Sequence, residues 1–213
     1  KGNKMYIPTN TKSKEGCFKA YKEEKELGSG FFGTAYLASK GKNKYAVKVQ
    51  DIRINNIEQG KTEAEIATKM GKIGVGPKIY ESYFCNHQNS LKLFIVQEYM
   101  AGGSLTDWKA QGNKFTPKLK QDLKNKVKLM HKHGIYHQDL KEDNILIQDK
   151  NGKQELFIGD FGISKTADSL TKDALFSDTQ DMKYVITGQY IRIQENQIHD
   201  LVIDDMIYNK RLK

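Results

Sequence analysis

The chain has 213 residues, of which 38% are hydrophobic and 29% charged, and its formal net charge is +9. This apolar fraction is enough for a folded core, and no segment approaches the ~18 apolar residues of a membrane span or has the pattern of a secretion signal. Cys17 and Cys85 cannot build a disulfide framework and match no zinc-binding spacing, so we expect a reducing intracellular location, the cytoplasm.

The first half of the chain is predicted to be rich in strands. Residues 1–20 are polar and without periodicity, which indicates an N-terminal tail or strap. A helix is predicted at 58–72, because Ile66, Ala67 and Met70 share one face. Alternating apolar residues and glycines predict strands at 24–29, 33–39, 43–50, 78–84 and 91–99.

The second half is predicted to be mainly helical. Gly102 and Gly103 form a linker, and short apolar runs predict strands at 145–147 and 156–158. Helices are predicted at 117–133, where Leu119, Leu123, Val127 and Met130 repeat at helical spacing, and at 180–191.

The positive charge is concentrated at 109–133, which holds eight lysines and one acidic residue, Asp122. Two interpretations are open: a solvated helix face, or a docking surface for an acidic partner protein. Aromatic residues do not alternate with these lysines, so no nucleic acid is expected as a ligand.

This order of elements predicts an α+β protein with two lobes. The first would be a small sheet-rich lobe with one main helix, and the second a mostly helical lobe. We place the tail or strap at 1–23, the N-lobe at 24–100 and the C-lobe at 101–213.

A glycine-rich sequence marks the first strand pair. It follows the pattern G-x-G-x-x-G, and because strand-like sequence comes next, the glycines belong to a hairpin whose backbone amides can approach phosphate. An ordinary glycine-rich hairpin is the alternative for this motif alone. The residues are Gly28, Ser29, Gly30, Phe31, Phe32 and Gly33.

Lys48 lies in the apolar strand sequence Ala46-Val47-Lys48, where its charge requires an anion such as phosphate or carboxylate. Glu63 and Glu65 on the predicted helix are the candidates. Apolar residues stand three, four and seven positions after Glu63, so its neighbouring face is expected to be buried. We therefore favour Glu63 and keep Glu65 as the alternative.

Two further motifs carry groups suited to phosphoryl transfer. The sequence HQDLKEDN offers Asp139 to accept a hydroxyl proton, Lys141 to neutralise a phosphoryl group and Asn144 to hold a metal ion. Asp160-Phe161-Gly162 follows sixteen residues after Asn144, beyond a predicted hairpin.

In this order and at these spacings, the motifs resemble the eukaryotic-type protein kinase family over residues 24–165. The resemblance implies a bilobed kinase-like α+β fold, with a small antiparallel-sheet N-lobe that carries one main helix and a reduced, mostly helical C-lobe. It also implies ATP as cofactor with Mg²⁺ (or Mn²⁺), and transfer of the γ-phosphate to a protein hydroxyl. Lys141 favours the serine/threonine class. The implied roles are phosphate binding and pairing with Glu63 for Lys48, orientation of the hydroxyl for Asp139, charge neutralisation for Lys141, and metal binding for Asn144 and Asp160.

The resemblance also implies an adenine site. Gln97 would be the gatekeeper, and the backbones of Glu98 and Met100 would meet adenine. Ala35, Ala46 and Leu146 would sandwich the ring, with Ala35 smaller than the valine usual there.

The sequence departs from the family in two places. Gln138 replaces the arginine that commonly binds a phosphorylated activation loop, so we do not expect activation by loop phosphorylation. Only 51 residues follow Gly162, no proline follows Pro117, and the Ala-Pro-Glu signature is therefore missing. Asp181 is either the aspartate that opens the family's central helix or an ordinary charged helix N-terminus.

Minimal kinases of this kind resemble effector kinases of pathogenic bacteria and kinases of large DNA viruses, which would place the protein in a host cell or virion. The main prediction is an active serine/threonine protein kinase with a protein substrate and an activating or docking partner. The first alternative is a nucleotide-binding pseudokinase or scaffold that acts through a partner. A small-molecule kinase is the second, and Lys141 argues against it.

Overall fold

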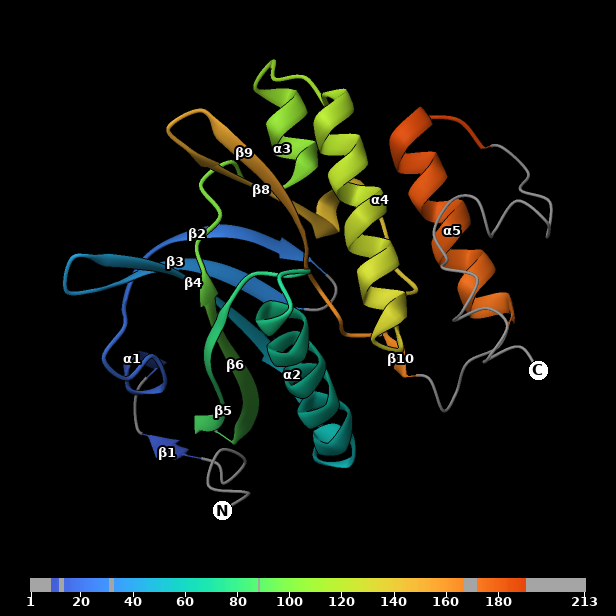
Figure 1. Cartoon of the computed structure of the whole chain (residues 1–213). Coiled ribbons are helices and arrows are strands. Elements are labelled where there is room, and N and C mark those ends of the chain that lie inside the picture. The colour runs from blue at the N-terminus through green and yellow to red at the C-terminus, as the bar shows by residue number, and fades with distance from the viewer. Residues whose placement is uncertain (1–8, 12–13, 31–32, 88, 167–171, 191–213) are drawn as a thin grey trace. The chain divides into compact units, whose positions relative to one another are not determined.

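The computed structural model describes residues 9–11, 14–30, 33–87, 89–166 and 172–190 (Figure 1). The chain divides into two compact units. The N-unit comprises residues 1–72 and 77–99, and the C-unit comprises 73–76 and 100–213. The α+β class predicted from the sequence is confirmed.

The N-unit is built on a six-stranded sheet with the order β1-β5-β6-β4-β3-β2. All neighbouring strands are antiparallel except β1, which runs parallel to β5. The five strands predicted from alternation are confirmed within a few residues, whereas β1 was not predicted. The strands are β1 (Thr9–Thr11), β2 (Lys22–Gly30), β3 (Gly33–Lys40), β4 (Asn43–Asp51), β5 (Ile79–His87) and β6 (Ser90–Glu98).

Helix α2 (Ile57–Lys72), which follows the short 3₁₀ helix η2 (Ile54–Asn56), packs on one face of this sheet. Because side chains alternate between the faces of a strand, Phe84, Leu93 and Ile95 form a core on one side, with Ile57 of α2 packed against them. The predicted helix at 58–72 is confirmed, with Ala64, Ile66, Ala67 and Met70 buried.

The opposite face of the sheet is covered by the segment that precedes β2. Helix α1 (Lys14–Cys17) and the residues after it bring Cys17, Phe18 and Tyr21 into a core with Tyr83 and Phe94. The ring of Phe18 meets that of Phe94 edge-on, with 5.4 Å between centroids. Residues 14–21 are therefore a packed strap, held by aromatic side chains in a segment that reads as polar overall.

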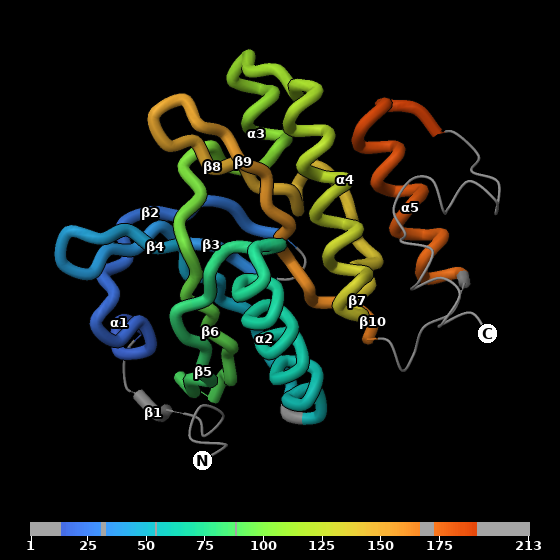
Figure 2. Tube along the Cα trace, in the orientation of Figure 1, coloured from blue at the N-terminus to red at the C-terminus, as the bar shows by residue number. Residues whose placement is uncertain are grey.

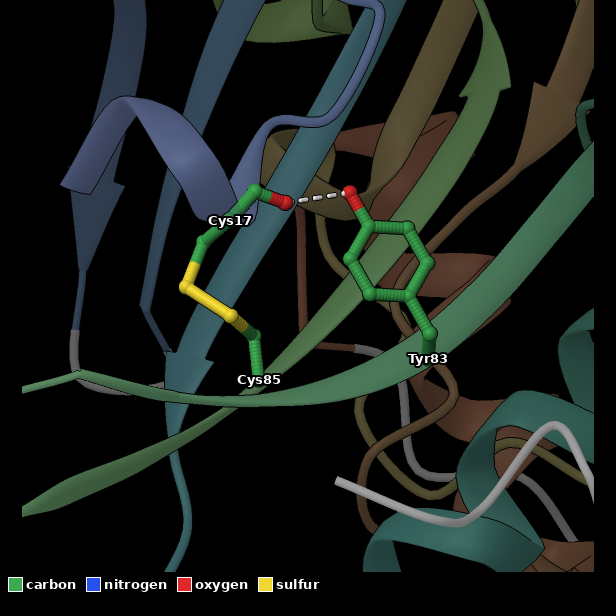
Figure 3. Close-up of a disulfide and its surroundings, with 3 residues drawn as sticks. All are labelled: Cys17, Tyr83 and Cys85. Atoms are coloured by element: carbon green, nitrogen blue, oxygen red, sulfur yellow. Dashed lines mark hydrogen bonds between the residues drawn. A yellow bond between two sulfur atoms is a disulfide. The ribbon is translucent and has the colours of Figure 1, made fainter. Parts of the chain in front are cut away.

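A disulfide joins this strap to the sheet (Figure 3). Cys17 is bonded to Cys85 on β5, and the hydroxyl of Tyr83 donates a hydrogen bond to the Cys17 carbonyl at 2.7 Å. Burial raises the pKa of the Tyr83 phenol, so this hydroxyl keeps its proton as a donor. The expectation of a reduced chain is wrong here. The pairing arises from a contact across 68 residues, which cysteine spacing cannot reveal.

The C-unit is predominantly helical, as predicted. Helix α4 (Pro117–Lys132) packs against strand β9 (Lys153–Ile158) and helix α5 (Lys172–Thr187) (Figure 2). Its buried face includes Leu119, Leu123, Val127 and Met130. Its N-terminus is capped by the Thr116 hydroxyl, which accepts from the Leu119 amide at 3.2 Å. The helices are α3 (Leu105–Ala110), α4 (Pro117–Lys132), the 3₁₀ helix η3 (Glu142–Asn144) and α5 (Lys172–Thr187), and the strands are β7 (Ile135–Tyr136), β8 (Ile145–Lys150), β9 (Lys153–Ile158) and β10 (Lys165–Thr166).

Two predictions for the C-unit need correction. The last described helix runs over 172–187 instead of 180–191, because its apolar stripe begins at Ala174 and Leu175. Helix α3 was not predicted, although Ser104 caps it by accepting from the Asp107 amide at 3.1 Å. In the described part of the chain, no helix has the length and apolar character needed to cross a membrane.

Reduction of the disulfide is expected to destabilise the N-unit. A crosslink that closes a loop of this length removes conformational entropy from the unfolded chain and contributes about 2–4 kcal/mol. Urea unfolding followed with and without dithiothreitol measures this difference. Cys17→Ala is the control: its free energy of unfolding should already be low and should not respond to the reductant. Equal stability of the oxidised and reduced wild-type chain would contradict the prediction.

Candidate active site

Lys48 and Glu63 form an ion pair in the N-unit. Lys48 lies on β4 and Glu63 on α2, and the Nζ–Oε1 distance is 2.7 Å. The Glu63 side chain is only 5% exposed, whereas Glu65 is exposed. Of the two glutamates left open by the sequence, Glu63 is therefore the one that reaches Lys48.

The glycine-rich hairpin joins β2 to β3, with Gly28 opposite Ala35 and Gly30 opposite Gly33. A Cβ at Gly28 or Gly30 would meet no atom within 4 Å, so these two positions border open space. Gly33 differs: its φ is +131°, and a Cβ there would lie 2.3 Å from the carbonyl oxygen of Val49. Ser29 pairs with Thr34, and Phe31 and Phe32 lie outside the described residues.

The other N-unit residues of the predicted adenine site lie on three neighbouring strands. Ala35 on β3 is opposite Lys48, and Ala46 on β4 is opposite Gln97 on β6. Glu98 ends β6, and its amide donates to the carbonyl of Lys78 at 2.9 Å.

The loop between β7 and η3 brings the predicted catalytic residues of the C-unit together. The Asn144 amide nitrogen donates to the backbone carbonyl of Asp139 at 2.8 Å and to its carboxylate at 3.1 Å. Lys141 Nζ lies 3.8 Å from the same carboxylate, and its side chain is 54% exposed. Asp139 is thus held from one side by a buried amide and faced by a cation that reaches into solvent.

His137 connects this loop to Asp160. Its Nδ1 accepts from the Asp139 amide at 3.1 Å, so the proton of the neutral ring sits on Nε2, which donates to the Gly159 carbonyl at 2.7 Å. The Gly159 amide in turn donates to the Asn144 carbonyl at 2.8 Å. These bonds place Asp160 immediately after a residue tied to both His137 and Asn144.

Asp160 has a left-handed backbone, with φ of 56°, a conformation that is strained for a residue other than glycine. Its carboxylate accepts from the Gly162 amide at 3.3 Å. Phe161, 4% exposed, packs edge-on against the His137 ring. Leu146 lies on β8, and Met100 is buried at the start of the C-unit chain that leads to α3.

A buried aspartate on α5, not predicted from the sequence, anchors the loop. Asp178 is fully buried and accepts from the amides of His137 and Gln138 at 2.8 and 2.7 Å. It also pairs at 2.8 Å with Nε2 of His131, which comes from α4. One carboxylate thus ties together α4, α5 and the loop that holds the predicted catalytic residues.

The electrostatics of this carboxylate follow from its partners. Burial by itself would raise the pKa of Asp178, but the hydrogen bonds from His131 and the Gln138 amide, with the charge of His131, outweigh burial and lower it. Asp178 therefore remains an ionised acceptor.

Asp181 does not lie at the start of a helix. Both interpretations of the sequence placed it at a helix N-terminus, and both are therefore wrong. It lies in the interior of α5, three residues after Asp178. Burial, with the carboxylates of Asp178 and Asp139 nearby, raises the pKa of Asp181 to about 6. A sequence signal does distinguish the buried aspartate of this helix. Asp178 stands at helical spacing within the apolar stripe of Ala174, Met182 and Val185, whereas Asp181 lies at the edge of this stripe.

Gln138, which stands where many protein kinases have an arginine, is bound to helix α5. Its backbone is left-handed, with φ of 71°, and its side-chain amide donates to the carbonyl of Ala174 at 2.7 Å and to Asp178 at 3.2 Å. Gln138 thus binds the first turns of α5 instead of presenting a charge to a phosphate.

The residues present fit a hard divalent cation. The Asn144 side chain donates to Asp139 through its nitrogen, which leaves its amide oxygen for another partner. Asp160 comes directly after Gly159, whose amide is hydrogen-bonded to the Asn144 carbonyl. Oxygen ligands of this kind suit Mg²⁺. Among the described residues, no cluster of three His, Cys, Asp or Glu side chains forms a metal site.

Residues 21–192 match the family model of the protein kinase domain. The chain belongs to the protein kinase family. Members of this family use ATP and a divalent metal ion.

Curated relatives agree with this assignment. CBL-interacting serine/threonine-protein kinase 12 of Arabidopsis thaliana is 32% identical over 161 residues, which cover 73% of this chain and 32% of the relative. Myosin light chain kinase A of Dictyostelium discoideum is 32% identical over 163 residues, covering 69% of this chain and 51% of the relative. The chain thus spans about a third to a half of the length of these two kinases.

Replacement of Asp181 by asparagine should make stability less dependent on pH. A carboxyl whose pKa is raised by folding binds its proton more tightly in the folded state, so the folded kinase loses stability as pH rises from about 4 to about 6. Asp181→Asn removes this loss. We expect the variant to be more stable than wild type by about 1–2 kcal/mol at pH 8, after allowance for solvent screening, and the gain to shrink toward pH 4.

Urea unfolding at pH 5 and pH 8 measures this difference. Asp173→Asn, which changes an exposed carboxyl on the same helix, is the matched control and is measured at the same two pH values. A gain for Asp181→Asn that is the same at both pH values would count against the assigned environment.

Proposed function

We propose that the chain is an ATP-dependent serine/threonine protein kinase. The observation that carries the proposal is the hydrogen-bonded loop in which Asn144 holds the Asp139 carboxylate and Lys141 faces it at 3.8 Å. A proton acceptor, a cation and an amide oxygen for a metal ion then stand within six residues of sequence, which is the equipment that phosphoryl transfer needs. The name of the Arabidopsis thaliana relative quoted above, a serine/threonine-protein kinase, supports the serine/threonine class.

In the proposed reaction, the hydroxyl oxygen of a serine or threonine attacks the γ-phosphorus of ATP. The bond between this phosphorus and the β–γ bridging oxygen breaks, and ADP leaves with the electron pair. Asp139 orients the hydroxyl and takes up its proton. Lys141 neutralises charge on the transferred group, for which its exposed amine has the freedom to move.

The N-unit supplies the phosphate contacts in this proposal. Lys48 would bind the α- and β-phosphates while Glu63 fixes its amine. Gly28, Ser29, Gly30 and Gly33, together with Phe31 and Phe32, would cover the phosphates with backbone amides. Adenine would meet the backbones of Glu98 and Met100, with Gln97, Ala35, Ala46 and Leu146 around it.

Asn144 and Asp160 would hold Mg²⁺, or Mn²⁺ in its place. The cation would neutralise phosphate charge and so favour departure of ADP. The protein groups that prepare this site are the Asp139–Asn144 hydrogen bond and the link from His137 to Gly159.

A pseudokinase that binds nucleotide and acts through a partner is the second candidate. What favours it is the sequence, in which no Ala-Pro-Glu motif follows Gly162. A kinase assay separates the two candidates, because a pseudokinase would bind ATP without transferring phosphate.

A partner with acidic character also belongs to the proposal. Lys120, Lys124, Lys128 and Lys132 recur every fourth residue along α4; we call them the lysine stripe. On the same helix, Lys118 forms an ion pair with Asp122, and Lys126 forms one with Glu155. Within the described residues, no lysine of the stripe forms an ion pair with an acidic side chain. Some of the relatives are named CBL-interacting kinases, and this chain is proposed to use the stripe for a protein partner of its own.

Asp139→Asn should abolish most of the activity without unfolding the chain. The amide retains the shape and the contact with Asn144 but cannot accept the proton, so phosphate transfer from [γ-³²P]ATP should fall about 10²–10⁴-fold. Thermal unfolding and binding of a fluorescent ATP analogue should change little. Asp160→Ala serves as the metal-site control and should also be inactive. Turnover of Asp139→Asn near that of wild type would remove Asp139 from its role.

Charge reversal in the lysine stripe should weaken binding of acidic ligands. Lys124→Glu with Lys128→Glu should lower affinity for a fluorescent polyglutamate peptide, and the wild-type affinity should fall with salt, because exposed charges are screened within ~10 Å at 0.1 M. Lys25→Glu with Lys42→Glu changes net charge equally at exposed positions of the N-unit and is the matched control. Equal losses in both double variants would show that only net charge matters.

A further inference from the structure

The Glu63 carboxylate has a second protein partner besides Lys48. Gln50 lies two residues after Lys48 on β4, and because side chains alternate along a strand, both reach the face of the sheet that carries α2. Lys48 Nζ is 2.7 Å from Glu63 Oε1, and Gln50 Nε2 is 2.6 Å from Glu63 Oε2. Each carboxylate oxygen is therefore bound by its own donor from the same strand.

The chemistry of the pair fixes the orientation of the Gln50 amide. A carboxylate paired with an ammonium group only accepts hydrogen bonds, so the nitrogen of Gln50, and not its oxygen, must face Glu63. Since Glu63 is 5% exposed, water cannot readily replace a lost donor, and an unbound oxygen there would be unfavourable. The contact with Gln50 is thus more than an incidental surface hydrogen bond.

The end of the glycine-rich hairpin rests on the same residue. A Cβ on Gly33 would lie 2.9 Å from Cβ and 3.0 Å from Cα of Gln50, so only glycine allows the hairpin to approach β4 this closely. The hairpin, the strand lysine and the helix glutamate therefore meet along three residues of β4, 48–50.

We infer that Gln50 is a positioning residue for phosphoryl transfer, acting through Glu63. In the proposed kinase reaction, on which this inference rests, the amine of Lys48 serves two anions, the phosphates and Glu63. When it turns toward phosphate, its hold on Glu63 weakens. Gln50 keeps the second oxygen bound during this exchange, so that α2 stays anchored to the sheet and Glu63 continues to direct Lys48.

Gln50→Met tests the inference, because methionine has nearly the length and shape of glutamine but no donor. We expect kcat to fall about tenfold or more while KM for ATP changes less, as befits a loss of positioning and not of nucleotide contacts. Gln50→Glu, which retains the shape and adds a like charge beside Glu63, should lower kcat further. Gln121→Leu, which removes a side-chain amide that is hydrogen-bonded on the exposed face of α4, is the matched control and should leave kcat unchanged.

A double-mutant cycle distinguishes an effect through Glu63 from a general loss of packing. In a Glu63→Gln background, Gln50→Met should cause little additional loss. An equal loss in both backgrounds, or a kcat for Gln50→Met within twofold of wild type, would overturn the inference.

Hydrogen exchange of the α2 amides provides a readout that does not depend on activity. Gln50→Met and Gln50→Glu should speed exchange across 57–72, and the Gln121→Leu control should not. If the wild-type chain transfers no phosphate but exchange in α2 still responds to Gln50, the proposed function fails and the anchoring role stands. Unchanged exchange in both Gln50 variants would reject the anchoring role itself.

Discussion

The candidate catalytic loop of the C-unit, residues 137–144, depends on one buried carboxylate. Asp178 accepts hydrogen bonds from the backbone of His137 and Gln138 and from the ring of His131, so a helix, a loop and a second helix converge on two oxygen atoms. Removal of one member of a buried charged pair typically costs about 3–5 kcal/mol, because the remaining groups cannot find water. Further hydrogen bonds extend from this anchored loop. The His137 ring binds the Asp139 amide and the Gly159 carbonyl, and the Gly159 amide binds the Asn144 carbonyl. Polar contacts of the backbone thus position Asp139, Asn144 and Asp160, whereas the Lys141 side chain extends into solvent.

The N-unit also contains a buried carboxylate that joins distant elements, but this carboxylate is bound by side chains instead of by backbone amides. Glu63 is nearly as buried as Asp178, but its partners are side chains of one strand, Lys48 and Gln50. Side-chain donors can exchange their partners, whereas the backbone amides that hold Asp178 cannot move without moving the loop. A carboxylate held by the backbone suits a scaffold that must stay fixed. A carboxylate held by a lysine suits the role proposed for Lys48, in which the same amine also binds phosphate.

Local patterns in the sequence predicted most of the fold but not the contacts that tie distant segments. Alternation and helical spacing placed the strands and α2 and α4 well, because these elements carry one apolar face each. The apolar stripe favoured Glu63 over Glu65. The strap, by contrast, is held by a disulfide and by Phe18 across a sheet formed much later in the chain. The anchoring role of Asp178 could not be predicted because its partners, His131, His137 and Gln138, lie about 40 residues or more away in sequence. Asp181 was singled out because the helix was predicted to begin at residue 180, whereas it begins at 172.

The disulfide also changes what a single cut in the backbone would do. Residues 17–85 form a closed covalent ring, and Gly28–Gly33, Lys48, Gln50 and Glu63 all belong to it. A protease that cleaves once within the ring leaves both pieces attached, so the phosphate-binding candidates stay on one molecule and can reassemble without a search through solution. The same cut in a reduced chain would produce two fragments. Two covalent connections, the backbone and the Cys17–Cys85 disulfide, therefore hold this part of the kinase together.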